Sequence, residues 1–112
     1  MKKIEAVVRE NQFLAVKEAL YAIEIHGMTV SEVHGCGKQK GKKEIYRGSE
    51  VFVEFRRKMK LEIVCHDSAV DEIIATICAA ARTGQVGDGK IFISPVEDVV
   101  RIRTGERGET AV

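Results

Sequence analysis

The chain has 112 residues, 45% of them hydrophobic, which is enough for one compact domain but hardly for two separate cores. Its formal charge is +1, and it carries only four Phe, two Tyr and no Trp, so nothing in the composition favours nucleic-acid binding. We see no membrane-length apolar run and no signal peptide, and the three cysteines lack metal-ligand spacing. We therefore expect a cytoplasmic protein with reduced thiols.

The first third of the chain predicts a strand, a helix and a second strand. Apolar residues alternate with more polar ones over residues 4–8, as in a half-buried strand. Over residues 13–23 the apolar positions follow helical spacing, and Gly27 is expected to end that helix. The β-prone residues 28–33 predict the second strand.

The middle of the chain predicts a long exposed loop followed by a two-faced strand. Residues 37–48 are polar and rich in lysine, and loops of this length in a compact domain are usually functional or disordered. We expect a mobile arm that becomes ordered on a partner. Further on, the apolar side chains of residues 59–65 share one face of a strand, and Lys58, Lys60 and Glu62 share the other.

The last third predicts a helix and short strands. Ser68 followed by Asp71 resembles a capping box, and residues 70–81 carry an apolar stripe at helical spacing. The apolar residues 91–93 and the β-prone residues 99–103 follow. This last segment is expected to be a strand.

The order β-α-β-β-α-β predicts an α+β fold of the ferredoxin-like type, with an antiparallel sheet and both helices on one face. The other face of the sheet would be open and apolar. Because a small chain rarely leaves such a face uncovered, we expect oligomerisation.

Three glycine-bracketed polar runs cover residues 35–41, 83–90 and 101–108, and each places Lys or Arg beside bare backbone amides. The first run is no P-loop, because no Lys-Ser/Thr follows it, and the second leads into a strand rather than a dinucleotide-binding helix. One such run alone is usually a turn. Arg101 and Arg103 are two apart on a predicted strand, so their side chains would point to the same side and could hold two phosphates. Together the three runs therefore predict a phosphate-binding site.

No set of residues predicts catalysis. The three histidines are scattered, and no nucleophile has a base beside it in sequence, so we expect no enzyme. Asp88 lies between two glycines and fits a ribose or metal contact as well as a turn. A small phosphatase of acylphosphatase type would need an arginine-asparagine pair that is not evident. A scaffold that binds no nucleotide would not need three basic glycine runs.

Five segments resemble, in order and spacing, the signature segments of the PII signal-transduction proteins of nitrogen metabolism. They are Gly37-Lys38-Gln39-Lys40-Gly41, Tyr46-Arg47-Gly48-Ser49-Glu50, Ala81-Arg82-Thr83-Gly84, Gly87-Asp88-Gly89-Lys90-Ile91-Phe92 and Arg101-Ile102-Arg103-Thr104-Gly105-Glu106. The resemblance covers residues 1–112 as a single domain. It implies a compact homotrimer with nucleotide sites between neighbouring subunits, a T-loop at about 37–55, a B-loop at about 82–90 and a C-loop at about 102–108.

The resemblance also implies the ligand contacts. The phosphates of ATP or ADP would be held by Gly87, Asp88, Gly89 and Lys90 of one subunit and by Arg101 and Arg103 of its neighbour. The base and ribose would lie against Val7, Thr29, Glu62 and Val64, with further nucleotide contacts from Gly35, Gly37 and Lys38. A site for 2-oxoglutarate, formed with ATP and Mg²⁺, would use Gln39 as the metal ligand, Lys58 as the cation, and Lys40, Gly41 and Gly87.

The function implied is sensing: each ligand state favours a different T-loop conformation, and that conformation selects the partner. The partner-binding part would be Tyr46, Arg47, Gly48 and Ser49, and Arg47 resembles the residue that plugs the pore of an ammonium transporter. The partners would be such a transporter, which brings the protein to the inner membrane, or nitrogen-assimilation enzymes or regulators. The alternative within the family is a regulator that acts directly on nitrogenase.

Some positions depart from the family pattern. Val51 stands where many members carry a nucleotidylylated tyrosine, so that modification is not expected, and Tyr46 is not its substitute by position. Ser49 matches a serine that is phosphorylated in some members. Lys38 replaces a common arginine and loses its bidentate fork for phosphate, and Cys36 replaces a usual aromatic residue.

Overall fold

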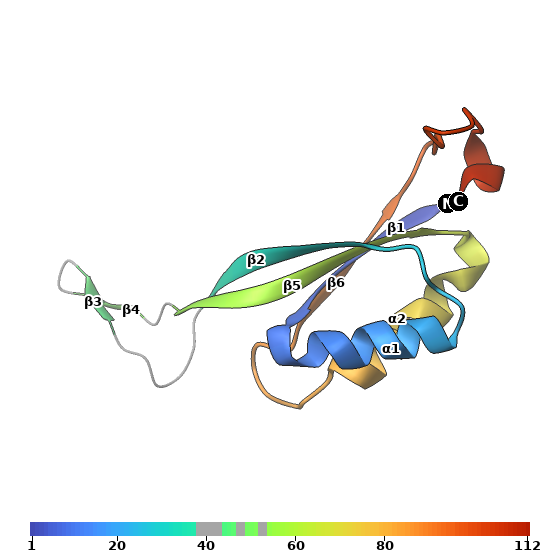
Figure 1. Ribbon diagram of the computed structural model, residues 1–112. Coiled ribbons are helices and arrows are strands. Elements are labelled where there is room, and N and C mark those ends of the chain that lie inside the picture. Colours follow the sequence, from blue (N-terminus) through green and yellow to red (C-terminus); the bar gives the residue numbers. More distant parts are fainter. Residues whose placement is uncertain (38–43, 47–48, 52–53) are drawn as a thin grey trace.

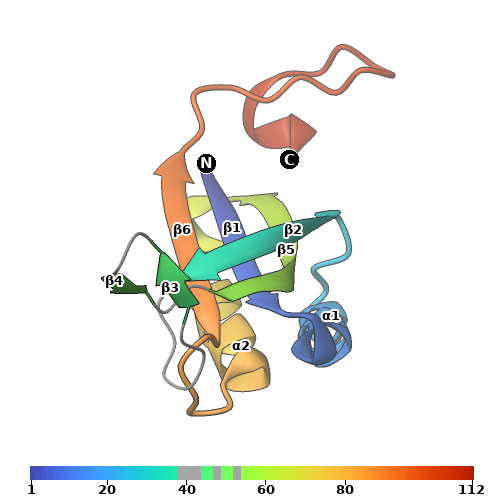
Figure 2. The same ribbon diagram turned by 90° about the vertical axis from the view of Figure 1, so that its left-hand side faces the viewer.

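The computed structural model describes residues 1–37, 44–46, 49–51 and 54–112. The elements in chain order are β1 (Lys2–Arg9), η1 (Glu10–Gln12), α1 (Phe13–Ala22), β2 (Thr29–Gly37), β3 (Glu44–Tyr46), β4 (Ser49–Val51), β5 (Glu54–Cys65), η2 (Asp67–Ala69), α2 (Val70–Ala81), β6 (Gly89–Pro95) and η3 (Gly108–Ala111). Four strands form an antiparallel sheet in the order β2-β5-β1-β6. Both helices cover one side of it (Figures 1 and 2), which confirms the expected ferredoxin-like α+β arrangement.

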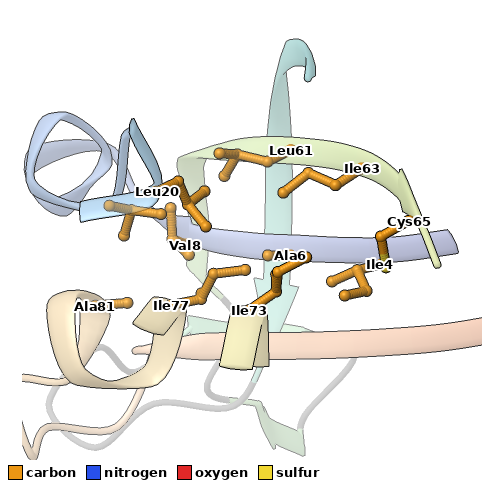
Figure 3. Packing of buried hydrophobic residues seen from close by; sticks show 11 residues of the cluster. Ile4, Ala6, Val8, Leu20, Leu61, Ile63, Cys65, Ile73, Ile77 and Ala81 are labelled. Carbon is orange, nitrogen blue, oxygen red and sulfur yellow. The ribbon is translucent and has the colours of Figure 1, made fainter. Parts of the chain in front are cut away.

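The core lies between the helices and the sheet, and alternation along the two central strands builds its sheet side (Figure 3). Ile4 lies opposite Ile63 and Ala6 opposite Leu61, so the apolar positions of β1 and β5 meet in register. The buried hydrophobic residues of the whole cluster are Ile4, Ala6, Val8, Val16, Leu20, Leu61, Ile63, Cys65, Ile73, Ile77 and Ala81. The predicted core faces of these strands and of α2 are confirmed.

The open face of the sheet is less apolar than expected. Ion pairs run along its two central strands, between Lys3 and Glu5 of β1 at 2.7 Å and between Lys60 and Glu62 of β5 at 3.2 Å. Exposed apolar side chains, such as Phe92 of β6 opposite Glu5, lie beside these pairs. Because the alternate positions of β1 and β5 are largely charged, the face combines ion pairs with separate apolar side chains.

The helix ends differ from the sequence expectations. Helix α1 ends at Ala22, well before Gly27, because Glu24 adopts a positive φ of 67° and turns the chain there. Helix α2 begins without a side-chain cap, so the capping box expected from Ser68 and Asp71 is wrong. The preceding 3-10 turn η2 replaces it, because a backbone bond from Ala69 N–H to the His66 carbonyl at 3.0 Å leads into the helix.

Two other segments also correct the sequence reading. Part of the expected loop at 37–48 is strand β3, which pairs with β4 in a separate two-stranded sheet. Residues 99–103 do not form a strand, and Val100 makes only an isolated bridge with Arg107. The reason is Asp98, whose carboxylate accepts hydrogen bonds from Arg107 Nε at 2.8 Å and from Gly108 N–H at 3.0 Å and folds the segment back on itself.

Candidate functional site

The loop between α2 and β6, residues 82–90 including the first two residues of β6, is organised by the carboxylate of Asp88. It accepts hydrogen bonds from the Thr83 hydroxyl, from Thr83 N–H at 2.8 Å and from Gly84 N–H at 3.0 Å. These bonds, those of Thr83 first, hold the pKa of the Asp88 carboxyl well below its ordinary value. Of the two roles left open for Asp88, the structure therefore favours that of a turn former.

Arg9, the last residue of β1, holds the same loop from the sheet. Its Nε donates to Asp88 Oδ1 at 3.0 Å, and its Nη2 donates to the Val86 carbonyl at 2.8 Å. The side chain is only 15% exposed. Sequence reasoning singled out neither Arg9 nor the role of Thr83, and no local pattern could have revealed Arg9, because 79 residues separate it from Asp88.

The glycines of this loop allow its backbone to curl against β1. Gly87 and Gly89 have φ angles of 101° and 111°, which side chains rarely tolerate. At Gly89 a Cβ would lie 1.8 Å from the Val7 carbonyl oxygen, so only glycine fits there. Within the part of the chain that the structure describes, the backbone N–H groups of Val86 and Gly87 donate to no acceptor. Successive free amides in a glycine-rich turn are a typical anion-binding arrangement.

Lys58 of β5 lies beside this loop. Its side chain is 8% exposed, and its Nζ donates to the Gly87 carbonyl. Its aliphatic part passes Gly35, where a Cβ would lie 3.3 Å from Lys58 Cγ. Three predicted ligand residues from β2, β5 and the 82–90 loop are therefore brought together.

The residues expected to contact the base and ribose lie on the open face of the sheet. Thr29 of β2 lies directly opposite Glu62 of β5. Val7 of β1 lies opposite Lys90 of β6, and by strand alternation both belong to this face, together with Val64. Thr29, Val64 and Lys90 are exposed, so this wall is an open surface rather than an enclosed pocket.

Arg101 and Arg103 belong to the segment after β6, which lies at the opposite end of that strand from the 82–90 loop (Figure 1). Residues 102–104 form a turn, so the expectation that the two arginines share one face of a strand is wrong. Arg101 donates to Glu106 Oε1 at 3.1 Å, whereas Arg103 is exposed and makes no hydrogen bond or ion pair with the described residues. Within one chain the structure does not bring them to the predicted phosphate loop.

The remaining predicted site residues fall on the segment 37–55. Gly37 ends β2, and Tyr46 and Ser49 belong to β3 and β4. The others lie outside the described residues: Lys38, Gln39, Lys40, Gly41, Arg47 and Gly48. In the described ranges, no group of three His, Cys, Asp or Glu side chains could hold a metal ion. No helix among those residues is long and apolar enough to cross a membrane.

Comparison with known proteins gives consistent matches over the whole chain. A family model described as nitrogen regulatory protein P-II matches residues 1–106. Proteins named nitrogen regulatory protein P-II from Microchaete diplosiphon and Azospirillum brasilense are 61% and 54% identical over 112 residues, which is 100% of each chain. A crystal structure of Arabidopsis thaliana PII bound to citrate superimposes with a TM-score of 0.80 at 44% identity, over 99% of this chain and 91% of that one. These relatives are named as regulators rather than enzymes, in agreement with the sequence expectation.

Proposed function

Since the chain belongs to the P-II family of nitrogen regulatory proteins, we propose that it senses ATP, ADP and 2-oxoglutarate and controls partner proteins through residues 37–55. One observation carries the nucleotide part of this proposal: among the described residues, the N–H groups of Val86 and Gly87 find no acceptor, and they lie in a glycine-rich turn whose Asp88 carboxylate is already bonded within the loop. Such a turn suits the oxygens of a phosphate.

We place the nucleotide between subunits of a homotrimer. The 82–90 loop precedes β6 and the segment with Arg103 follows it at the other end of the strand, so one small ligand would meet both by lying between two chains. The exposed apolar side chains on the open sheet face, such as Phe92, support burial of that face against another copy. Each interface would then pair the loop of one subunit with Arg101 and Arg103 of its neighbour.

The 2-oxoglutarate site would lie at Lys58 and Gly87. A lysine that is 8% exposed offers its ammonium to a carboxylate that would otherwise be buried without a counter-charge. The related Arabidopsis protein was crystallised with citrate, another small carboxylic acid, which supports acid binding in this family. Gln39 would supply an amide oxygen to Mg²⁺, a ligand that suits this hard cation.

The output would pass through the T-loop. Tyr46, Arg47, Gly48 and Ser49 would contact the partner, which we propose to be an ammonium transporter or a nitrogen-assimilation enzyme or regulator. The protein would be cytoplasmic and would reach the membrane only through such a transporter. The T-loop would switch because each ligand binds one of its conformations more tightly than the others.

Calorimetric titration of 2-oxoglutarate tests the proposal. The acid should bind in the presence of MgATP and not with MgADP or without nucleotide, because the γ-phosphate helps to hold the metal. Lys58→Met and Gln39→Ala should abolish binding. Arg57→Met is a matched control, because Arg57 lies on the same strand and pairs with Glu10 at 3.4 Å, outside the proposed site. Similar binding in all nucleotide states, or a Lys58→Met protein that behaves like the control, would refute this assignment.

A further inference from the structure

We propose that Arg9 is a positioning residue for anion binding by the 82–90 loop. It holds Asp88 and the Val86 carbonyl, and thereby keeps the N–H groups of Val86 and Gly87 in place for the ligand. This inference rests on the proposed function, in which that ligand is the phosphate of a nucleotide.

The geometry gives one guanidinium two separate attachment points on the loop. Arg9 Nε reaches Asp88 Oδ1 at 3.0 Å, and Nη2 reaches the Val86 carbonyl oxygen at 2.8 Å. The backbone of Arg9 is fixed in the sheet, because Arg9 of β1 lies directly opposite Lys58 of β5 in the strand register. A glycine-rich loop loses much conformational entropy when it is ordered, and contacts from a rigid strand offset that loss.

No other described contact can replace Arg9 at this half of the loop. The bonds that Asp88 accepts from Thr83 and Gly84 join the two ends of the loop but do not hold the Val86 carbonyl between them. Among the described residues, two side chains from outside the loop bond to the turn at 86–87. Arg9 donates to the Val86 carbonyl, and Lys58 donates to the Gly87 carbonyl. Removing Arg9 therefore leaves the Val86 carbonyl without this bond, and of the two side chains only Lys58 still holds the turn. In the proposed function Lys58 also binds the acid ligand.

Arg9 acts through the loop rather than as a phosphate ligand. Its charge is already matched by the Asp88 carboxylate, and two of its donors are bound to the loop. Lysine could not reproduce this arrangement, because one ammonium group lacks the planar fork that reaches two acceptors in fixed directions.

The first test is ADP affinity measured by calorimetry. Arg9→Gln should weaken ADP binding about tenfold to a hundredfold, and Arg9→Lys should fall between it and the unmodified protein. Arg57→Gln is the matched control: it removes an equal charge from nearby β5, where Arg57 forms a pair with Glu10 at 3.4 Å. It should bind ADP as the unmodified protein does. An Arg9→Gln protein with unchanged affinity would overturn the inference.

A double-mutant cycle separates positioning from direct contact. Much of the effect of Arg9→Gln should disappear when Asp88 is already replaced by Asn, because Asp88 is one of the two groups through which Arg9 acts. Fully additive losses would show that Arg9 does not act through Asp88 and would also overturn the inference.

Amide hydrogen exchange of the nucleotide-free protein tests the same idea without any ligand. In Arg9→Gln the amides of residues 83–88 should exchange faster, whereas those of Leu61 and Ile77 in the core should remain protected and so confirm folding. Unchanged exchange in the loop would contradict the positioning role. If the unmodified protein failed to bind ADP while the loop exchange still changed, the proposed function would fail and the structural role of Arg9 would stand.

Discussion

Two loops of this protein use the same chemistry in different ways. In each, an aspartate carboxylate accepts hydrogen bonds from backbone N–H groups and from an arginine. Asp88 is bound by Arg9, 79 residues away on β1, and this arginine is 15% exposed. Asp98 is bound by Arg107 and Gly108, at most ten residues away, and Arg107 is 69% exposed. The first loop is anchored to the sheet, whereas the second is held mainly within itself.

This difference suits the roles that we propose for the two segments. The sheet sets the position of the 82–90 loop, as a phosphate cradle requires. The segment 98–108 carries Arg103 on a turn stabilised by its own contacts, so it can present that cation to a neighbouring subunit. The same residue types therefore build a fixed site in one place and a self-supporting arm in the other.

The largest expected effect comes from Gly89, where the anchored loop touches β1. Gly89→Ala should destabilise the protein by about 3 kcal/mol or more, because the new Cβ meets the Val7 carbonyl and φ is strained. Gly105→Ala in the self-held segment has a positive φ but no atom within 4 Å, so it should cost only about 1 kcal/mol. Urea denaturation measures both values. Equal losses would contradict the distinction between the two loops.

The next largest effect is expected at Arg103, where a substitution should change nucleotide binding but not the stability of the fold. Arg103→Ala should weaken ADP binding by about tenfold or more, because a charge-assisted phosphate contact is lost. It should change the free energy of unfolding by less than about 0.5 kcal/mol, since Arg103 is exposed and bonds to no described residue. Lys17→Ala on α1, the side of the sheet opposite the open face, removes the same charge and controls for general electrostatics. Unchanged ADP affinity would exclude Arg103 from the site.

The smallest expected difference is between the pH values at which Asp88 and Asp98 become protonated. The pKa of the Asp88 carboxyl is strongly lowered, and the hydrogen bonds from Thr83 are the largest cause. The pKa of the Asp98 carboxyl is lowered less, and the bond from Arg107 is its largest cause. A lowered pKa stabilises the fold above the unfolded value of about 3.9, and this contribution is lost as pH falls through the folded pKa. Carboxyl carbon NMR titration should therefore show Asp98 protonating before Asp88 during acidification. The reverse order would contradict the stronger anchoring of Asp88.

Much of the fold could be predicted because its signals are local. The alternation in β1 and β5 and the apolar stripe of α2 identified the buried positions, including Ile4, Leu61 and Ile77. The β-prone residues 99–103 were misread, because propensity does not include the Asp98 carboxylate that competes for nearby backbone N–H groups. A local preference was overridden by a specific set of hydrogen bonds.

The sequence by itself determined the two helices and the four strands of the main sheet in their order, the buried faces of the central strands and of α2, the glycine runs and the family. Periodicity and motifs express these features within a few neighbouring residues. Only the tertiary structure decided that Arg9 holds Asp88, that Lys58 reaches Gly87, and that the segment 98–108 lies at the far end of β6 from the 82–90 loop. These relations depend on how the antiparallel sheet brings distant parts of the chain together, and no spacing along the sequence contains that register.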